Sequence, residues 1–217
     1  MAASAATLVV GSKELSSWSL RPWLLMKQAG IPFKEVVIQL DKSDTKALIA
    51  KWTPSGKVPV LIDGDVTVWD SLAIAEYLNE THPRAHLWPA DRAARAHARA
   101  ISAEMHSMFR ELRVRLPMAF STLGLKPDMN DDCRRDITRM VAIWVDARKK
   151  YGAGGAFLFG SFTITDAMFA PVASRFTSYG THLADFGDDG SAEAYRAMMM
   201  ALPAMLEWGV GAKAELA

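Results

Sequence analysis

The chain changes its pattern near residue 82, and this change limits the folds that it can adopt. Up to about residue 80, short apolar runs rich in β-branched residues alternate with segments whose apolar residues recur at helical spacing. From residue 92 onward the long segments are helical in pattern, and none has the composition of a strand. The sequence therefore predicts an α/β domain followed by an all-α domain.

The first part is expected to contain four strands and three helices. The expected strands cover residues 7–10, 36–40, 58–62 and 66–69, and the expected helices cover residues 19–29, 43–51 and 72–79. Asp63-Gly64, between the last two strands, is a strong signal for a β-hairpin. The order is a βαβ unit, a helix and then a ββα unit, which is typical of a thioredoxin-like domain.

The second part follows a linker that contains two prolines, Pro83 and Pro89, which disfavour helix in the residues before them. Proline or glycine separates the expected helices, which cover residues 92–122, 129–151, 165–179, 191–200 and 203–213. The predicted organisation is an N-terminal thioredoxin-like domain at 1–82, a linker at 83–91 and an all-helical domain at 92–217.

Charge and composition argue against several classes of function. The 25 basic and 24 acidic residues nearly cancel and are spread along the chain, so neither nucleic acid nor a membrane is an expected partner. No apolar run reaches the roughly 18 residues of a membrane span, and the first residues do not resemble a secretory signal. The single cysteine, Cys133, fits a reducing compartment. The 5 histidines show no ligand spacing, so no metal is expected. These features predict a cytoplasmic protein.

Three short motifs are candidates for chemistry, and each also has an ordinary structural explanation. Ser16 and Ser17 precede the first expected helix, where free N–H groups and the helix dipole favour an anion, but serines there are also common caps. Lys57-Val58-Pro59 opens a strand with a proline that could be cis and leave the valine N–H and C=O free, although proline is common at strand starts. Asp70 and Ser71 suit a ligand's ammonium and carboxylate groups, or they cap a helix.

In this order, the motifs resemble those of the cytosolic glutathione S-transferases. The segments that carry the resemblance are Ser16 to Arg21, Val58-Pro59, Asp70-Ser71 and the run Leu72 to Leu78. The serine-rich element is similar to that of the zeta class and its bacterial relatives, although Trp18 stands where that class has cysteine. Phe159 to Asp166 resembles the family's structural N-capping box, in which Thr163 caps a helix. The resemblance covers essentially the whole chain.

The resemblance implies a site for glutathione, as co-substrate, in the first domain. Ser16 matches the thiol-contacting serine of the family, and Ser17 is the second candidate for this catalytic contact. Val58 would pair its backbone with the cysteinyl part, and Asp70 and Ser71 would hold the γ-glutamyl end. The implied glutathione-binding residues are Ser16, Ser17, Trp18, Arg21, Lys57, Val58, Pro59, Asp70 and Ser71.

The resemblance also implies a homodimer and a second substrate, a small hydrophobic electrophile held over the helical domain. Candidates for that pocket lie on the first long helix: Met105, His106, Met108, Phe109, Arg110 and Arg113. Methionine and aromatic residues at helical spacing usually belong to a core or an interface, and we expect His106 to be packed or at the surface rather than an acid–base group.

Two other functions stay open. The first is a glutathione-dependent cis–trans isomerase for maleylacetoacetate-like diacids, in which Arg110 and Arg113 could serve the carboxylates. The second is a glutathione- or ligand-binding protein without catalysis. Thiol–disulfide exchange is not expected, because Ser16, Ser17 and Trp18 occupy the region where it needs a cysteine, and Cys133 is expected to be inert.

Overall fold

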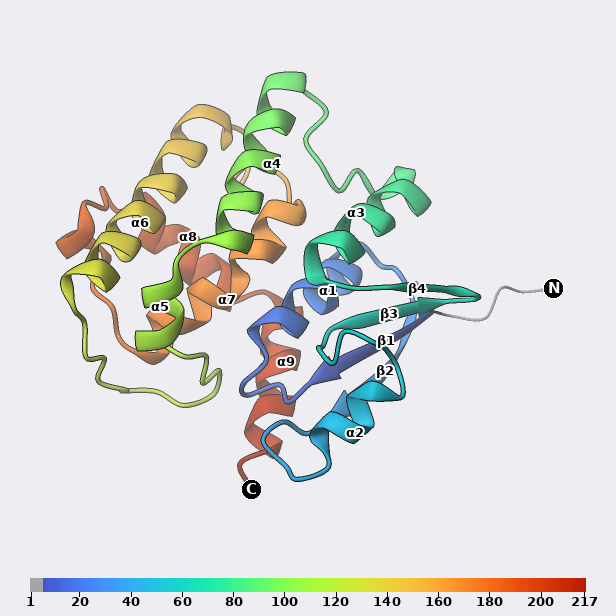
Figure 1. The fold of residues 1–217 in the computed structure, drawn as a ribbon. Coiled ribbons are helices and arrows are strands. Elements are labelled where there is room, and N and C mark those ends of the chain that lie inside the picture. The colour runs from blue at the N-terminus through green and yellow to red at the C-terminus, as the bar shows by residue number, and fades with distance from the viewer. Residues whose placement is uncertain (1–5) are drawn as a thin grey trace.

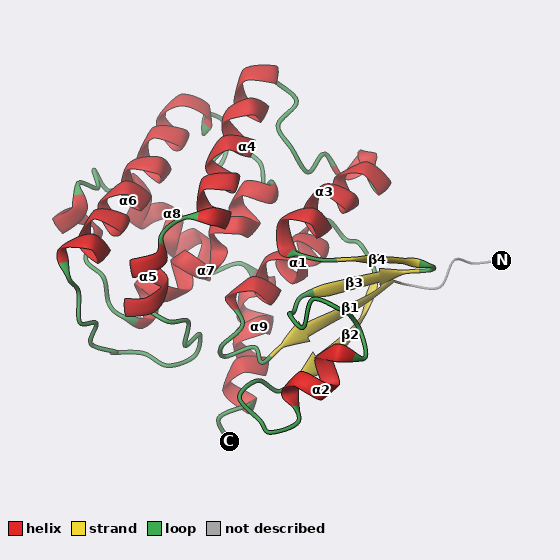
Figure 2. Ribbon diagram, in the orientation of Figure 1, coloured by secondary structure: helices red, strands yellow, loops and turns green. Residues whose placement is uncertain are grey.

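Four strands form one mixed sheet, in the order β2-β1-β3-β4 (Figures 1 and 2). In the computed structural model, which describes residues 6–217, the strands are β1 (Ala6–Gly11), β2 (Phe33–Ile38), β3 (Val60–Asp63) and β4 (Val66–Val68). β1 is parallel to β2 and antiparallel to β3, and β4 is antiparallel to β3. Gly64 has φ +58° in the turn between β3 and β4, so the hairpin predicted at Asp63-Gly64 is confirmed.

Three helices cover the two faces of this sheet: α1 (Ser17–Gln28), α2 (Thr45–Ala50) and α3 (Ser71–Thr81). α1 and α3 lie on the face toward the helical region, and α2 covers the opposite face (Figure 1). β1 is buried on both sides, because Leu8 and Val10 pack in the large core while Val9 packs in a smaller cluster with Ile49 of α2. This arrangement confirms the predicted thioredoxin-like domain.

The remaining helices are α4 (Arg92–Ser107), α5 (Arg110–Arg115), α6 (Asp131–Tyr151), α7 (Ile164–Ser178), α8 (Ser191–Met200) and α9 (Pro203–Ala214). Two short 3-10 helices, η1 (Pro83–Ala85) and η2 (Leu183–Phe186), lie in the connections. Among the described residues, no strand of a sheet follows β4, so the mostly helical second part is confirmed. No helix in the described part of the chain is both long and apolar enough to cross a membrane.

The single helix predicted over residues 92–122 is wrong. It breaks at Met108 and Phe109, and Phe109 has φ +63° with its side chain buried. α5 then ends at Arg115, two residues before Pro117. Burial of the Phe109 ring offsets the free-energy cost of its left-handed backbone conformation. Local sequence patterns do not reveal this burial.

The two parts of the chain share one hydrophobic core, in which α7 is central. α7 packs against α1, α4 and α8, and most of its residues are buried. The predicted capping box fixes its start: the Asp166 carboxylate accepts the Thr163 N–H at 2.8 Å. α7 therefore supports α1, the helix that begins at the serine motif.

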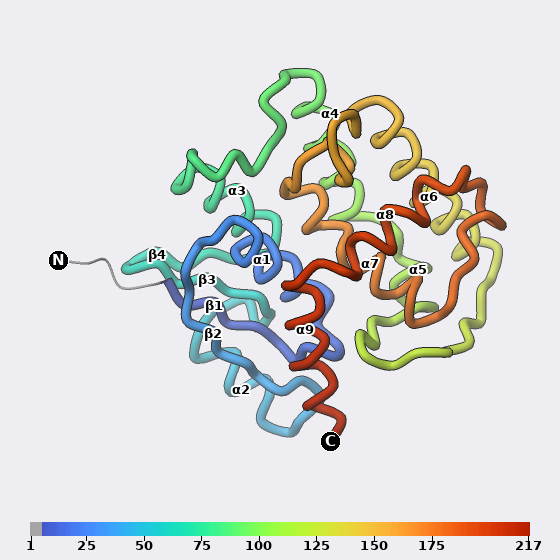
Figure 3. Tube along the Cα trace, turned by 180° about the vertical axis from the view of Figure 1, so that it is seen from behind, coloured from blue at the N-terminus to red at the C-terminus, as the bar shows by residue number. Residues whose placement is uncertain are grey.

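The C-terminal segment runs beside α1 and meets the loop that precedes it (Figure 3). The Trp208 Nε1–H of α9 donates to the Lys13 carbonyl at 2.8 Å. The Glu215 carboxylate accepts the backbone N–H groups of Lys13 and Glu14 at 2.7 and 3.0 Å. Residues from the end of the chain therefore fix the loop that leads to Ser16.

Candidate functional site

Three of the sequence motifs meet at one cavity of about 380 Å³ between the sheet domain and α4. The lining residues are Trp18, Lys57, Val58, Pro59, Asp70 and His106. The first five belong to the predicted glutathione-binding set. The sixth comes from the helical region and was not in that set.

Ser16 and Ser17 differ in what their hydroxyl groups do. Ser16 is the N-cap of α1: its Oγ accepts the Ser19 N–H at 3.4 Å and its O–H donates to Ser19 Oγ at 2.7 Å. Ser19 Oγ in turn accepts the Gly11 N–H at 3.0 Å. The Ser17 hydroxyl takes no part in these bonds between Ser16 and Ser19. Both serines lie at the N-terminus of α1, where the helix dipole favours an anion.

The Val58–Pro59 peptide bond is cis, as the sequence suggested. Neither the Val58 N–H nor its C=O is hydrogen-bonded to another backbone group of the described chain. Val58 lines the cavity, so one donor and one acceptor of an extended backbone are available there. This is the arrangement that an extended peptide ligand needs.

Asp70 and Ser71 begin α3. One oxygen of Asp70, Oδ1, accepts the N–H groups of Leu72 and Ala73 at 3.0 and 3.4 Å, so the carboxylate caps the helix. The other, Oδ2, lies 3.1 Å from His106 Nε2. Ser71 is fully buried, and its Oγ accepts a hydrogen bond from Arg21 Nη1 at 3.5 Å.

Arg21 is a buried cation with spare donors. Its side chain is 1% exposed, and its Nε and Nη2 atoms have no partner within residues 6–217. Burial, and then the neighbouring cations Arg113 and Arg175, lower the pKa of Arg21. A buried guanidinium without a carboxylate partner attracts an anion, and Ser71 lies beside it.

Trp18 lines the cavity and contacts two guanidinium groups. Arg21 lies 4.3 Å and Arg113 lies 4.8 Å from the centre of its ring, and both distances are typical of cation–π contacts. The His106 ring meets the indole edge-on, with ring centres 5.2 Å apart. Trp18 therefore joins the sheet domain to α4 and α5.

The candidates for the electrophile pocket divide into three groups. Met105 and Phe109 are buried in the core, as the packing explanation expected. Met108 is exposed, and the Arg110 side chain is 86% exposed and paired with Glu111. His106 makes an aromatic contact with Trp18, and Arg113 makes a cation–π contact with it.

The part that His106 plays was missed from the sequence. Its place beside Asp70 depends on how the end of α4 packs against the start of α3, and the two residues are 36 positions apart. No local pattern reports that packing. Burial, followed by the cations Arg21 and Arg113, lowers the pKa of His106, against the opposing effect of Asp70.

Cys133 takes no part in this cavity. It is fully buried near the start of α6, and burial raises the pKa of its thiol to about 11. A buried thiol with a raised pKa is a poor nucleophile.

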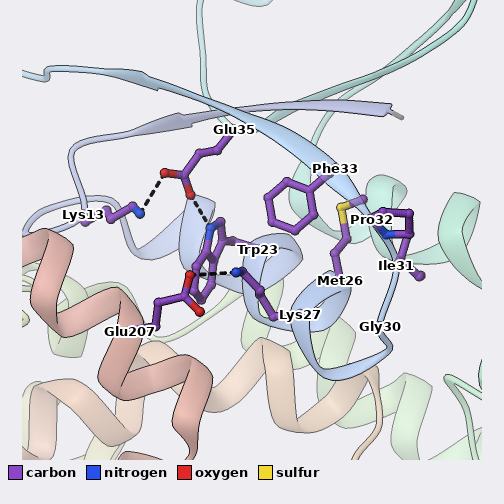
Figure 4. A pocket seen from close by; sticks show the side chains of 10 residues that line it. All are labelled: Lys13, Trp23, Met26, Lys27, Gly30, Ile31, Pro32, Phe33, Glu35 and Glu207. Carbon is purple, nitrogen blue, oxygen red and sulfur yellow. Dashed lines mark hydrogen bonds and ion pairs between the residues drawn. The ribbon is translucent and has the colours of Figure 1, made fainter. Parts of the chain in front are cut away.

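A second cavity, of about 410 Å³, lies between α1, β2 and α9 (Figure 4). Its charged groups pair with one another: Lys13 Nζ lies 2.8 Å from Glu35, and Lys27 Nζ lies 2.6 Å from Glu207. The Lys13 ammonium also lies over the rings of Trp23 and Trp208. These contacts hold α9 against α1.

Comparisons with known proteins agree with this architecture. Residues 15–81 match the family described as glutathione S-transferase, N-terminal domain. A probable maleylacetoacetate isomerase from Caenorhabditis elegans is 44% identical over 87 residues, which are 40% of this chain and 39% of that protein. A dichloromethane dehalogenase from Methylorubrum extorquens is 40% identical over 65 residues, which are 29% and 23% of the two chains. The chain thus spans about two fifths or less of the length of these curated relatives.

Solved structures extend the likeness to nearly the whole chain. A glutathione transferase homologue from Burkholderia, solved with bound glutathione, superposes with a TM-score of 0.70 at 22% identity and covers 96% of this chain and 98% of that one. The fold is therefore that of the glutathione S-transferases. Residues 15–81 therefore match the N-terminal domain of the glutathione S-transferase family, and nearly the whole chain shares the fold of a solved glutathione transferase homologue.

Proposed function

We propose that the protein is a glutathione transferase that uses a serine hydroxyl at the N-terminus of α1 to hold glutathione as its thiolate. The proposal rests on one observation: the cavity of about 380 Å³ combines the free backbone groups of Val58 with the Asp70 carboxylate, and its wall includes Trp18, next to Ser17. The thiol loses its proton to solvent. Its sulfur then forms a bond to an electrophilic carbon, and the leaving group departs with the bonding electron pair.

One hydrogen bond from the serine hydroxyl is enough to lower the pKa of the thiol. A cysteine thiol has a pKa of about 8.5, and lowering it by about two units needs roughly 2.7 kcal/mol of preferential stabilisation of the thiolate. One hydrogen bond to a charged group supplies about 1.5–3 kcal/mol, and the dipole of α1 adds about 0.3–1 kcal/mol. A serine that only donates a hydrogen bond is therefore sufficient, and no general base is required.

The donor is Ser16 or Ser17, and the hydrogen-bonding pattern supports Ser17. The Ser16 O–H would have to leave Ser19 Oγ before it could donate to sulfur, whereas the Ser17 hydroxyl is not engaged by Ser19. The family pattern matches Ser16 instead. Alanine variants of the two serines distinguish the two donors, because only the variant that lacks the donor should lose activity at neutral pH.

The remaining site residues suit the other groups of the tripeptide. The Val58 N–H and C=O would pair with the cysteinyl backbone. Asp70 would accept the γ-glutamyl ammonium, and Ser71 together with the spare donors of Arg21 would bind the adjacent carboxylate. Lys57 and Trp18 would form the edges of the site.

A glutathione-dependent isomerase of maleylacetoacetate-like diacids is the second candidate function. Arg113, which stacks on Trp18 and has an unpartnered buried Nη1 within residues 6–217, could bind a substrate carboxylate. The likeness to the probable maleylacetoacetate isomerase favours the same reaction. Arg110 points to solvent and lends no support.

The test combines retention on immobilised glutathione with turnover of a panel of halogenated aromatics, peroxides and maleyl diacids. Retention with conjugation of the electrophiles supports the transferase, and turnover of the diacids alone supports the isomerase. Retention without any turnover supports a binding protein, and lack of retention contradicts all three. A homodimer and a cytoplasmic location belong to the same proposal, and the dimer is tested by its mass in solution.

A further inference from the structure

We propose that His106 of α4 is a positioning residue of the glutathione site, which donates from Nε2 to the Asp70 carboxylate and holds it in place for the γ-glutamyl ammonium. This inference rests on the proposed function. It assigns to the helical part of the chain a direct influence on the γ-glutamyl end of the tripeptide.

The contacts of Asp70 carry the argument. Oδ1 accepts two backbone N–H groups at the start of α3, and Oδ2 lies 3.1 Å from His106 Nε2. Each oxygen thus has a fixed donor, so the carboxylate plane cannot rotate freely. A carboxylate accepts about four hydrogen bonds, and the Asp70 side chain is 54% exposed, so acceptor positions remain open toward the cavity.

The imidazole is itself held in place. Its edge-on contact with Trp18 fixes one side of the ring, at a centre-to-centre distance of 5.2 Å. Nδ1 is buried and has no hydrogen-bond partner among the described residues. A neutral ring therefore carries its proton on Nε2, where Asp70 accepts it, because a proton on Nδ1 would be buried without an acceptor.

The charges around His106 favour the neutral ring. The groups that face it are Asp70 on α3, Arg21 on α1 and Arg113 on α5, and Lys57 lines the same cavity. Burial and the two arginines outweigh Asp70 and lower the pKa of His106. A neutral donor orients the carboxylate without cancelling its charge. The full negative charge of Asp70 thus stays available to the ammonium, for which an imidazolium would compete.

The decisive experiment compares two thiols. Glutathione carries the γ-glutamyl ammonium, and cysteinylglycine lacks the whole γ-glutamyl group. For His106→Ala, we expect the KM for glutathione to rise about tenfold, as for loss of a hydrogen bond to a charged group, while kcat changes less than about twofold. The KM for cysteinylglycine should not change. His106→Gln keeps an N–H donor at similar reach and should restore most of the loss.

Two further variants separate positioning from folding. His97→Ala is the matched control, because His97 is also a partly buried histidine of α4 with an acidic neighbour, Asp146, but does not line the cavity. It should leave both KM values unchanged. In an Asp70→Asn background, His106→Ala should add no further loss, since the residue acts through Asp70.

An unchanged KM for glutathione in His106→Ala would overturn the inference, and so would an equal rise for the two thiols. A wild-type protein that binds no glutathione in calorimetry would instead remove the proposed function. If the wild type binds glutathione and the His106→Ala variant keeps the wild-type KM for glutathione, only the inference about His106 is contradicted. The two failures are therefore distinguishable.

Discussion

The Glu14 carboxylate accepts both the backbone N–H and the hydroxyl of Ser121, at 2.8 and 2.6 Å. Its other oxygen accepts the Thr122 hydroxyl at 2.8 Å, and the Phe120 N–H donates to the Glu14 carbonyl at 3.1 Å. Glu14 is 4% exposed. The loop that delivers Ser16 and Ser17 is therefore fastened to the helical part of the chain by a buried acid.

Glu14→Ala should lower the free energy of unfolding by about 3 kcal/mol, because it leaves the partly buried donors of Ser121 and Thr122 without their acceptor and removes a buried carboxylate that accepts three hydrogen bonds. Turnover should fall as the serine loop loses its support. Urea unfolding measures the first effect. Glu80→Ala, at an exposed position of α3, is the control and should stay within about 0.5 kcal/mol of the wild type. A change of the free energy of unfolding as small as this for Glu14→Ala would show that the hydrogen bonds of Glu14 to Ser121 and Thr122 do not stabilise the fold.

Glu215→Ala should reduce kcat about two- to fivefold and should lower the free energy of unfolding less than Glu14→Ala does. The reason is that the Glu215 side chain holds two N–H groups of the serine loop by hydrogen bonds of roughly 1 kcal/mol each. Steady-state kinetics with saturating glutathione provide the measurement. Glu207→Ala removes a glutamate of α9 that pairs with Lys27 instead, so it controls for loss of charge. Wild-type kinetics for Glu215→Ala would contradict a role for Glu215 in supporting the serine loop.

Replacement of the thiol-contacting serine by alanine should reduce kcat at neutral pH about 10- to 100-fold, in line with the loss of a hydrogen bond to a charged group, and leave glutathione binding nearly intact. The loss should diminish above the pKa of the free thiol, about 8.5, where the thiol ionises without help. The pH–rate profiles of Ser16→Ala and Ser17→Ala decide between the two. Both profiles matching the wild type would exclude a serine-dependent thiolate.

Trp18→Ala should allow the protein to use bulkier electrophiles as the second substrate. It should also remove the cation–π contacts that Arg21 and Arg113 make with the indole ring. Loss of two cation–π contacts, each about 0.5–2 kcal/mol, should lower the melting temperature. Trp18→Phe keeps a ring and should retain most of both properties. Unchanged ratios of kcat/KM across electrophiles of graded size would show that the indole does not bound the acceptor pocket.

Asp166 should make stability depend on pH in an unusual direction. Burial raises the pKa of this carboxyl to about 6, against the hydrogen bonds from Leu158, Thr163 and Tyr195. A native pKa above the unfolded value of about 3.9 means that the native state holds the proton more tightly. The stabilisation is complete below pH 4 and is lost as the pH rises through 6.

Asp166→Asn, which cannot titrate, is the reference for this effect. The free energy of unfolding of the wild type relative to Asp166→Asn should fall by about 3 kcal/mol between pH 4 and 7, from a shift of about two pKa units at roughly 1.4 kcal/mol each. Denaturant unfolding at a series of pH values measures the difference. A difference that stays constant or rises would contradict the raised pKa.

Local signals predicted much of the fold. β-branched runs marked the strands, and Asp63-Gly64 marked the hairpin because glycine accepts the positive φ of the turn. The start of α7 was also predicted, because Thr163 and Asp166 form the expected capping box of this helix. Asp44 occupies the N-cap position of α2, although its side chain makes no capping bond.

What could not be predicted depends on long-range packing. The break at Phe109 has no glycine or proline to announce it, and residues 116–122, predicted as helix, form the loop that holds Glu14. The site shows the same limit. Its residues from the sheet domain follow strand ends and helix starts, but His106 and Arg113 reach the cavity only because the helical part packs there.

The most direct test of the serine mechanism is a crystal structure with glutathione bound. We expect the glutathione sulfur to lie within about 3.5 Å of the Ser17 or Ser16 hydroxyl oxygen, with the cysteinyl backbone paired to Val58 and the γ-glutamyl ammonium on Asp70. A sulfur beyond that distance from both hydroxyl groups, in an otherwise occupied cavity, would contradict the mechanism.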